Sequence, residues 1–388
     1  MIRKIAVVTA TRAEYGILMP LIRKIDEHTA LDLDLIVTGM HLSRKYGYTI
    51  NEIYCDGFFI SHEIPILDED NSPYGISVTM SNAIEGFAKC FRDDRPDMVV
   101  ILGDRTEMLG VASAAMNERI PIAHIHGGEV TQGAVDDCVR HAITKMSYLH
   151  FAATDVYRRR IIQLGENPER VFHVGSLGAE NILTQKLYSK EQLIEKTSEL
   201  SEVGKRKYVV VTYHPVTLEG NCVEDQICEL GSVMSERNDL FYLITASNAD
   251  VGGHRANEML QDFAGKNKNT AFVYNLGMKR YLSAVKYASF VMGNSSSGIL
   301  EAPVIGTPAV NIGDRQKGRL MTDIVMNCKP QKEDILRAIS YAERLPHKPT
   351  SIYGDGHTSN KIVEIILSTL NQGINLKKSF YDLGVKNV

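Results

Sequence analysis

The sequence has no excess of basic residues and no hydrophobic run long enough to cross a membrane. Its 388 residues include 43 Lys and Arg against 47 Asp and Glu, which gives a formal net charge of −4. A general nucleic-acid-binding protein needs a basic surface, and a bilayer-spanning helix needs about 20 consecutive apolar residues. We therefore expect no nucleic-acid partner and no membrane partner.

The sequence also lacks closely spaced cysteines and an export signal. Its six cysteines are scattered and include no C-x-x-C pair, so we expect buried thiols instead of disulfides or a zinc site. The first residues lead directly into a strand-like segment, without the apolar region and cleavage site of a signal peptide. These features predict a soluble cytoplasmic protein.

Short β-branched runs alternate with amphipathic helical segments along almost the whole chain. Apolar residues make up 44% of the sequence and charged residues 23%, which excludes intrinsic disorder. Strands that are hydrophobic throughout and separated by helices predict parallel sheets covered on both faces. The expected strands are residues 4–9, 33–38, 98–102, 122–125, 149–152, 208–212, 241–245, 271–274, 290–292 and 309–312.

The length and the number of strands predict two domains. A single core usually divides at this chain length, and ten strands suffice for two doubly wound sheets. The stretch 183–206 is rich in Lys, Glu and Ser, and we place the boundary near it. Ligands of such sheets bind beyond the carboxyl ends of the strands, so the residues that follow each strand are the candidates for a site.

The first expected strand is followed by T-A-T-R-A-E-Y-G at residues 9–16. A small-residue turn that opens a helix, with Arg12 beside it, suits an anion held by backbone N–H groups and a guanidinium. It is neither a Walker A loop nor a G-x-G-x-x-G fingerprint, so neither ATP nor NAD is indicated. An ordinary turn with a surface arginine is the alternative.

Acidic residues follow two neighbouring strands of the first half. Asp104 ends one strand with Arg105 beside it as a counter-charge, Glu129 lies in a glycine-rich loop, and Asp136 begins the next helix. Carboxylates at neighbouring strand ends can divide the roles of base and acid. Helix N-capping is the alternative role for Asp104 and Asp136.

A metal site is a competing interpretation of the same region. His124 and His126 are two residues apart on one strand and therefore share a face, and Asp104 could be a third ligand. The interpretation is weakened because no H-E-x-x-H motif or further closely spaced histidine follows.

The second half of the chain is predicted to bind a phosphate. His214 follows a strand stopped by a proline, where an imidazole could meet a phosphate or a reacting proton. Residues 293–298, G-N-S-S-S-G, place hydroxyls and glycines between a strand and a helix, which is typical of a phosphate site. Glu301 could accept hydrogen bonds from a ribose diol, and the loop 313–319 adds positive charge.

Together these segments resemble one family, the hydrolysing UDP-N-acetylglucosamine 2-epimerases of sialic-acid biosynthesis. The match runs in order from the first strand to about Arg319. It rests on T-R-A-E-Y-G at 11–16, G-D-R at 103–105, H-I-H-G-G-E at 124–129, D-D at 136–137 with R-H at 140–141, H-P at 214–215, and the segments 293–298 and 313–319. The H-V-E-A-G-L-R motif of the non-hydrolysing bacterial epimerases is not present.

The resemblance implies a glycosyltransferase-B-like α/β fold, with two doubly wound Rossmann-like domains facing a cleft. It implies an N-terminal domain over residues 1–180 with the catalytic acids and a C-terminal UDP-binding domain over residues 205–356. Residues 357–388 would form a helix and tail that return toward the first domain. It further implies a UDP-sugar substrate, a homodimer or homotetramer, and no metal or other cofactor.

The resemblance also assigns the site residue by residue. The expected catalytic residues are Asp104, Glu129, Asp136 and His214. The expected substrate-binding residues are Arg12, His41, Arg105, Asn248, Ser295, Ser296, Glu301 and Arg315, to which the cationic loop adds Arg319. Some relatives carry Glu where this chain has His126, so the order in which the three acids act stays open.

The implied reaction converts UDP-N-acetylglucosamine and water to N-acetylmannosamine and UDP, through elimination to a glycal and its hydration. The same reaction on UDP-2,4-diacetamido-2,4,6-trideoxyglucose, as in legionaminic-acid routes, is the nearest alternative. A glycosyltransferase of the same fold, a metal-dependent hydrolase and a non-catalytic nucleotide-sugar sensor are the others. The three clustered acids favour the epimerase.

Overall fold

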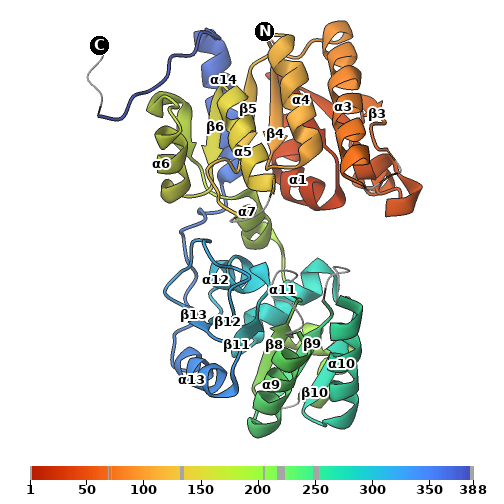
Figure 1. Cartoon of the computed structure of the whole chain (residues 1–388), viewed down its shortest axis with the longest axis vertical. Helices are drawn as coiled ribbons and strands as arrows, with labels where there is room; N and C mark the ends of the chain where they lie inside the picture. Colours follow the sequence, from red (N-terminus) through yellow and green to blue (C-terminus); the bar gives the residue numbers. More distant parts are fainter. Residues whose placement is uncertain are drawn as a thin grey trace. The chain divides into compact units, whose positions relative to one another are not determined.

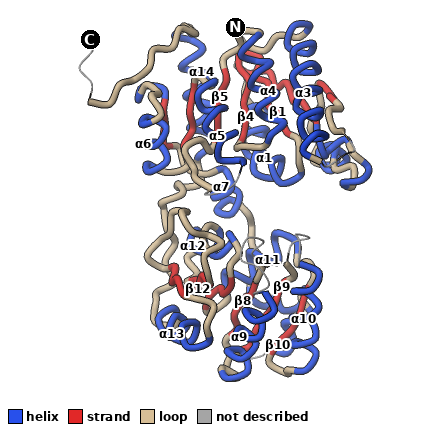
Figure 2. The backbone as a smooth tube through the Cα atoms, in the orientation of Figure 1, coloured by secondary structure: helices blue, strands red, loops and turns tan. Residues whose placement is uncertain are grey.

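The protein forms two compact α/β units. The computed structural model describes residues 2–68, 70, 72–131, 135–203, 206–215, 223–247 and 253–384. Unit 1 consists of Met1–Asn181 and Tyr353–Val388, and unit 2 of Ile182–Ile352 (Figure 1). In each unit the strands form a central layer with helices on either side (Figure 2). The predicted fold class of two doubly wound Rossmann-like domains is confirmed.

Unit 1 contains a seven-stranded parallel sheet in the order β3-β2-β1-β4-β5-β6-β7. The direction of strand addition reverses between β1 and β4, which are neighbours in the sheet although β2 and β3 separate them in the chain. The strands are β1 (Arg3–Thr9), β2 (Leu31–Thr38), β3 (His62–Ile64), β4 (Met98–Leu102), β5 (Ile122–Ile125), β6 (Leu149–Ala152) and β7 (Val171–His173).

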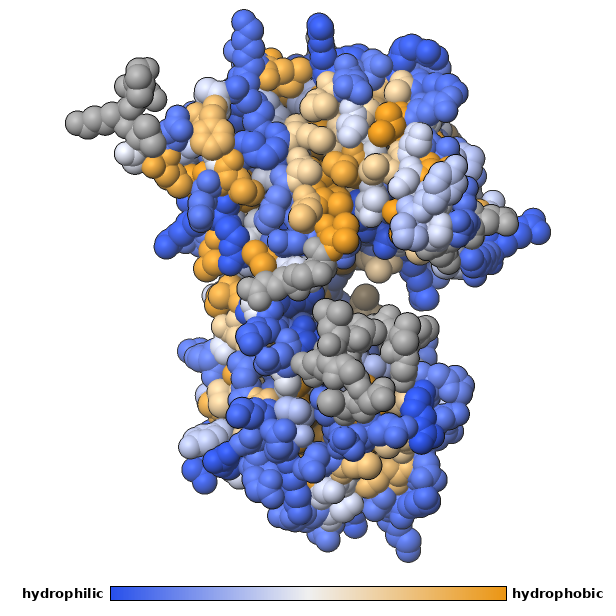
Figure 3. Space-filling model, viewed as in Figure 1, coloured by the Kyte–Doolittle hydropathy of each residue, from blue (hydrophilic) through white to orange (hydrophobic). Residues whose placement is uncertain are grey.

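Two apolar cores cover the two faces of this sheet. One lies under α1 (Arg12–Asp26), α2 (Ile50–Cys55) and α14 (Thr358–Gln372), and the other under α3 (Pro73–Asp93), α4 (Thr106–Asn117) and α5 (Val135–Met146). Apolar side chains also gather on the surface over α4 and α5 (Figure 3). The remaining helical segments are η1 (Gly39–Leu42), η2 (Arg44–Tyr46), α6 (Asp155–Gln163), η3 (Pro168–Arg170) and α7 (Leu177–Thr184).

Unit 2 contains a six-stranded parallel sheet in the order β10-β9-β8-β11-β12-β13, with its reversal between β8 and β11. The strands are β8 (Tyr208–Thr212), β9 (Phe241–Thr245), β10 (Thr270–Val273), β11 (Phe290–Gly293), β12 (Ala309–Ile312) and β13 (Val325–Cys328). The helical segments are α8 (Lys190–Lys196), η4 (Ser198–Val203), α9 (Val223–Glu236), α10 (Gly253–Lys266), α11 (Gly277–Tyr287), η5 (Ser296–Gly298), α12 (Glu301–Ile305) and α13 (Lys332–Ala342). None of the helices among the described residues is long and apolar enough to cross a membrane.

The predicted strands are confirmed, and three further strands were missed. These are β3, β7 and β13, which have three or four residues each and form edges of the sheets. Edge strands face solvent in part, so their residues lack the continuous hydrophobic run on which the prediction relied. The predicted helix at residues 16–27 begins earlier, at Arg12, because the Thr11 hydroxyl accepts a hydrogen bond from the Glu14 N–H and caps it.

Candidate active site

In each unit several of the candidate residues lie where the strand order reverses. Doubly wound sheets bind ligands beyond the carboxyl ends of the two strands at which the order reverses. In unit 1 the segments at this position are residues 10–12 after β1 and residues 103–105 after β4. In unit 2 they are residues 213–215 after β8 and residues 294–297 after β11.

Arg140 of α5 joins the three segments of unit 1 that carry the predicted acids. Its buried guanidinium forms an ion pair with the Asp104 carboxylate. It also donates to the Glu129 carbonyl oxygen at 2.9 Å and to Asp137 Oδ1 at 3.1 Å. Asp137 Oδ1 in turn accepts from the Thr131 N–H at 2.8 Å. One arginine thus holds the end of β4, the loop after β5 and the first turn of α5 together.

The structure distinguishes between the two roles considered for Asp104. Helix α4 begins at Thr106 with Arg105 as its N-cap residue, so Asp104 is not the cap. Its carboxylate instead pairs with Arg140. An acid at this strand end is therefore held in place by a cation and not by a helix terminus.

Arg105 is surrounded by carboxylates. Its Nε lies 2.5 Å from Glu107 Oε1. Burial lowers the pKa of Arg105, but the neighbouring carboxylates offset this, and the net shift is upward. The carboxylates are Glu107, Glu14 and Asp136. Asp136, on the exposed first turn of α5, is therefore within electrostatic range of Arg105.

Glu14 is an acid of this site to which the sequence analysis gave no role. Its side chain is buried, and its Oε2 accepts hydrogen bonds from the Ala10 N–H at 3.1 Å and the Thr11 hydroxyl at 3.3 Å. Burial raises its pKa to about 7, against the opposing charge of Arg105. The T-x-x-E spacing of a capping box was the available signal, but the spacing contains no information about burial.

The metal interpretation of His124 and His126 is wrong for His124. Its Nε2 lies 2.7 Å from the Gly103 carbonyl oxygen and its Nδ1 lies 3.2 Å from Thr144 Oγ1, so both ring nitrogens are engaged within the protein. Burial lowers its pKa to about 3. His124 is therefore a neutral residue that connects β5 to the end of β4.

His126 lies beside Glu129 in the glycine-rich loop. Its Nδ1 is 3.6 Å from Glu129 Oε1, and its backbone has a left-handed φ of +64°. The Glu129 side chain is one-third exposed. The glycine-rich loop thus places an imidazole close to the Glu129 carboxylate.

Arg12 and His41 differ in how available they are to a ligand. The Arg12 side chain is 71% exposed, and its Nε lies 3.0 Å from Glu52 Oε2. His41 is buried, with Nε2 3.1 Å from Thr9 Oγ1 and Nδ1 2.8 Å from Thr49 Oγ1. Burial lowers its pKa to about 4. His41 is thus a neutral connection between β1 and α2, and its substrate contact stays a prediction.

Asn294 joins the candidate segments of unit 2. Its Oδ1 accepts from the His214 N–H at 2.6 Å, and its Nδ2 donates to the His214 carbonyl oxygen at 2.7 Å. Its own carbonyl oxygen accepts from Arg315 Nη1 at 3.2 Å and from Gln316 Nε2 at 2.9 Å. The fully buried Asn294 therefore places His214 and the cationic loop beside the Ser295–Ser296 segment.

A helix follows the serine segment with Glu301 in its first turn, as predicted, but the helix is short and a separate turn precedes it. Residues Ser296–Gly298 form a 3₁₀ turn, and α12 begins only at Glu301 and has five residues. Pro303 explains this start, because it lacks an N–H and fits only in the first helical turn. Backbone N–H groups of a turn, and not a long helix dipole, are what Ser295 and Ser296 offer to an anion.

A close approach of strands explains the glycine that begins this segment. Gly293 has a φ of +137°, and a Cβ atom added there would lie 1.9 Å from the Thr212 carbonyl oxygen. The turn that follows is held by side chains, since Ser295 Oγ accepts from the Ser297 N–H and Tyr281 donates its hydroxyl to Ser297 Oγ at 2.6 Å.

Glu301 and Arg319 lie within electrostatic range of each other. Burial raises the pKa of Glu301, and the positive charge of Arg319 opposes this shift. Glu301 Oε2 is buried and has no hydrogen-bond partner among the described residues. This oxygen could accept a hydrogen bond from a hydroxyl group, and the contact of Glu301 with a ribose stays a prediction. Asn248 lies outside the described residues.

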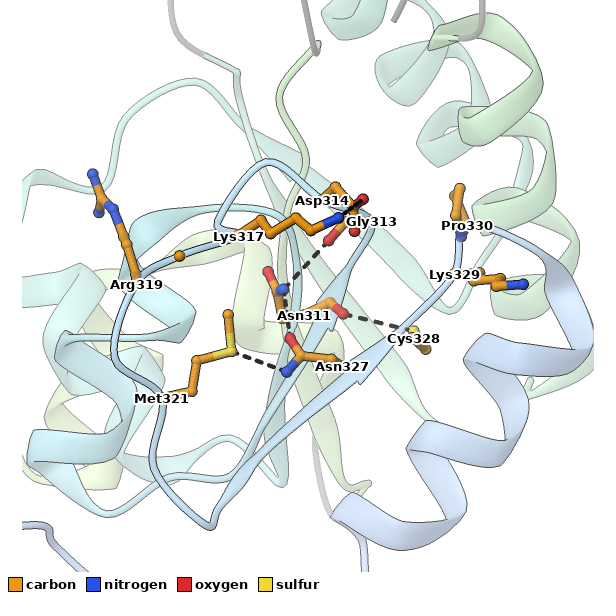
Figure 4. Close-up of a pocket in the computed structure, with 11 residues that line it drawn as sticks. Asn311, Gly313, Asp314, Lys317, Arg319, Met321, Asn327, Cys328, Lys329 and Pro330 are labelled. Carbon is orange, nitrogen blue, oxygen red and sulfur yellow. Dashed lines mark hydrogen bonds and ion pairs between the residues drawn. The ribbon is translucent and has the colours of Figure 1, made fainter. Parts of the chain in front are cut away.

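The cationic loop lines a cavity of about 650 Å³ at the carboxyl ends of β12 and β13. This volume is in the range of small-molecule sites, roughly 300–1,000 Å³. Figure 4 shows Lys317 directed toward Asp314, at 3.1 Å, and Arg319 on a separate part of the wall. The floor contains Asn311, whose Nδ2 donates to Asn327 Oδ1 at 2.8 Å.

Comparisons with known proteins agree on one family. The family model described as UDP-N-acetylglucosamine 2-epimerase matches residues 23–367. The chain is 41% identical to the GDP/UDP-N,N'-diacetylbacillosamine 2-epimerase (hydrolyzing) of Campylobacter jejuni, covering 98% of this chain and 99% of that protein. It is 38% identical to the polysialic acid biosynthesis protein P7 of Escherichia coli, covering 98% of each. It is 31% identical to the UDP-N-acetylglucosamine 2-epimerase of Neisseria meningitidis, covering 99% and 100%.

Solved structures share the fold at low sequence identity. A crystal structure of UDP-GlcNAc 2-epimerase from Neisseria meningitidis bound to UDP-GlcNAc superposes with a TM-score of 0.75 at 18% identity, over 94% of this chain and 100% of that one. A putative UDP-N-acetylglucosamine 2-epimerase from Listeria monocytogenes superposes with a TM-score of 0.77 at 17% identity, over 99% and 100%.

Proposed function

The chain belongs to the UDP-N-acetylglucosamine 2-epimerase family, in its hydrolysing group, and from this premise we propose that it converts UDP-N-acetylglucosamine and water to N-acetylmannosamine and UDP. The observation that supports this most strongly is the Arg140 network, which holds Asp104 beside the loop of Glu129 and the first turn of α5. A cluster of acids is what inversion at carbon 2 requires.

The first step is the loss of UDP. The hydrogen on carbon 2 is barely acidic, so the bond from carbon 1 to the diphosphate stretches first and positive charge develops next to carbon 2. The C1–O electron pair leaves with UDP, a carboxylate takes the proton from carbon 2, and a double bond forms between the two carbons. Stabilisation of the departing anion therefore dominates the barrier.

The second step reverses the configuration. A second acid gives a proton to carbon 2 of the glycal from the opposite face, and water adds at carbon 1 while it releases a proton. The product is N-acetylmannosamine. We assign the binding of the departing UDP to Arg315, Arg319, His214 and the Ser295–Ser296 turn of unit 2.

We assign the principal proton transfer to Glu129 among the three acids. Asp104 is committed to its ion pair with Arg140, which makes it a weaker base. Glu129 is one-third exposed, its carboxylate is not held by Arg140, and the His126 imidazole lies 3.6 Å away. Asp136 supplies a further carboxylate beside Arg105.

A second candidate substrate is UDP-N,N'-diacetylbacillosamine. It is favoured by the names of two relatives, the Campylobacter protein at 41% identity and a Legionella pneumophila UDP-N,N'-diacetylbacillosamine 2-epimerase (hydrolyzing) at 34% identity, over 94% of this chain and 96% of that one. The chemistry at carbons 1 and 2 is the same for both sugars. They differ at carbons 4 and 6.

The test is incubation with each UDP-sugar in deuterated water, followed by NMR. We expect UDP release without any acceptor, and a 2-epimerised sugar with one deuterium on carbon 2, because the second acid has exchanged with solvent. The sugar with the higher kcat/KM is the substrate. Absence of UDP release from both sugars would contradict the epimerase, and a product with hydrogen on carbon 2 would contradict the glycal route.

A further inference from the structure

A second polar cluster lies in unit 1, away from the candidate active site. Asp34 is in the middle of β2, His62 is the first residue of β3, and Asp94 directly follows α3. Figure 1 shows β3 next to α3 at one edge of the unit 1 sheet. Asp34 is paired in register with Ala6, the middle residue of β1. His62 begins β3 and Asp94 precedes β4, so these two residues lie toward the amino ends of the strands. The candidate active site lies beyond their carboxyl ends.

The distances in this cluster suit a metal ion. His62 Nε2 lies 3.1 Å from Asp94 Oδ2 and 3.6 Å from Asp34 Oδ1. The three potential ligand atoms all lie within 4.8 Å of one another, and they are the one such group among the residues that the structure describes. Tetrahedral ligands about 2.0–2.1 Å from Zn²⁺ are about 3.3 Å apart, so small side-chain movements would complete the geometry.

Asp34 provides a second and independent indication. Its side chain is 3% exposed, and neither carboxylate oxygen has a hydrogen-bond partner among the described residues. Burial raises the pKa of Asp34, and His62, Lys4 and the Ser61 hydroxyl oppose this shift only in part. A buried carboxylate without a hydrogen-bond donor is unfavourable in its charged form unless a cation approaches it.

The surroundings leave one face of the cluster open. The side chains of His62 and Asp94 are 30% and 40% exposed, so an ion and its water ligands can reach them from solvent. Lys4 is the nearest cation, and it pairs with Asp94 Oδ1, the oxygen that does not face His62. Asp94 can therefore keep Lys4 on one oxygen and bind an ion with the other.

We propose that Asp34, His62 and Asp94 form a binding site for a divalent transition-metal ion of the Zn²⁺ type. One imidazole nitrogen and two carboxylate oxygens are the ligand set that such borderline ions accept. The ion joins β2, β3 and the end of α3, three segments that are distant in the sequence. It takes no part in the reaction, because it binds at the opposite end of the strands.

The test is a titration of the chelator-treated full-length protein with ZnCl₂, followed by calorimetry and metal analysis. We expect one Zn²⁺ per chain, and a raised thermal unfolding midpoint when it binds. His62→Gln and Asp94→Asn should each weaken Zn²⁺ binding at least about tenfold. Their epimerase turnover should equal that of the wild type.

Two control variants separate this site from other zinc ligands. His254→Gln removes an exposed histidine of α10 in unit 2, and Cys90→Ser removes a thiol of α3 near the two acids. Both should keep full Zn²⁺ affinity. Asp34→Asn should also lose Zn²⁺ binding. If this variant does not fold, His62→Gln and Asp94→Asn alone test the proposal.

Absence of Zn²⁺ binding by the wild type would overturn the proposal, and so would unchanged affinity in His62→Gln and Asp94→Asn. Absence of epimerase turnover in a wild-type protein that binds Zn²⁺ would instead contradict the proposed function, so the two failures are distinguishable.

Discussion

Glu129 is the single side chain on which the proposed chemistry depends most. It is exposed enough to meet a substrate, and the His126 imidazole lies 3.6 Å away. Its backbone carbonyl is fixed by Arg140 at 2.9 Å, which orients the loop without neutralising the carboxylate. Glu129 is therefore positioned by its backbone while its carboxylate stays accessible.

We predict that Glu129→Gln lowers kcat by about 10²–10⁴-fold, the usual contribution of a general acid or base. Glutamine preserves the size of the side chain but cannot take a proton, so the affinity for UDP should not change. UDP release and calorimetry measure the two quantities. Glu169→Gln, an exposed residue of η3, is the matched control. Undiminished turnover would refute the catalytic role.

Glu14 combines burial with a position beside Arg105, so its protonation depends on pH near neutrality. Burial raises its pKa to about 7 from an ordinary value of 4.5. Between these two pH values the folded protein keeps a proton that the unfolded chain has released. The free energy of unfolding therefore falls as pH rises through this window, by up to about 3 kcal/mol.

We predict that Glu14→Gln removes this fall in the free energy of unfolding with rising pH. Glutamine can still accept from the Ala10 N–H and the Thr11 hydroxyl, but it does not titrate. The variant should therefore gain stability relative to the wild type between pH 5 and pH 8, measured by denaturant unfolding. The control variant Glu118→Gln, at the end of α4, should have the stability of the wild type at pH 5 and at pH 8. The prediction would be contradicted if the free energies of unfolding of Glu14→Gln and the wild type differed by the same amount at pH 5 and at pH 8.

At the scale of elements, α5 is the support of the unit 1 site. Its first turn carries Asp136, and its buried Arg140 binds the end of β4 and the loop after β5. The guanidinium makes several hydrogen bonds in fixed directions, which a lysine ammonium on a flexible stem does not reproduce. The site therefore depends on one residue that does not itself transfer a proton.

We predict that Arg140→Lys lowers kcat about 100-fold and stability by about 3 kcal/mol, because Asp104 and Asp137 lose part of a buried network. UDP affinity should not change, since unit 2 is proposed to bind UDP. Steady-state kinetics, calorimetry and thermal unfolding check the three expectations. Arg159→Lys on α6, 78% exposed and paired with Asp155, is the control. Wild-type kinetics in Arg140→Lys would show that the network does not position the acids.

In unit 2 the corresponding role falls to Asn294. It connects His214, Arg315 and Gln316 through both its amide and its backbone carbonyl. The connection joins the ends of β8 and β11 to the loop after β12. Short strand-end segments thus depend on one buried amide for their relative positions.

At the scale of the whole molecule, the chain completes unit 1 with its last segment. Helix α14 packs against α1 in the unit 1 core. Beyond it, Lys378 pairs with the buried Glu166 at 2.6 Å and donates to the Ser147 carbonyl oxygen. Burial raises the pKa of Glu166, but its hydrogen bonds with His150, Lys145 and Lys378 more than offset this effect. The net result is a pKa lowered to about 2. The tail therefore helps to compensate a buried charge.

We predict that Lys378→Met lowers the stability of unit 1 by about 2 kcal/mol, because Glu166 loses one of its three cationic or imidazole partners. Thermal unfolding measures this change. Lys377→Met alters the exposed neighbouring residue and should have no effect. Equal stability of the two variants would show that the tail contributes nothing to unit 1.

The sequence by itself determined the fold class, the family and most strand ends. Buried parallel strands are continuous hydrophobic runs, and this signal is local. The segments after those runs, such as residues 103–105 and 293–298, were therefore located correctly. The domain boundaries, the site residues, the homo-oligomer and the absence of a cofactor stay predictions.

Only the tertiary structure decided which polar groups are buried together. The burial of Glu14, the network of Arg140 and the enclosed nitrogens of His124 each depend on residues more than ten positions away or on another element. Asp34 alternates with leucines along β2, a pattern typical of a solvent face, yet it is buried under α3. The pattern of one strand describes its own two faces, whereas burial depends on which helix packs against them.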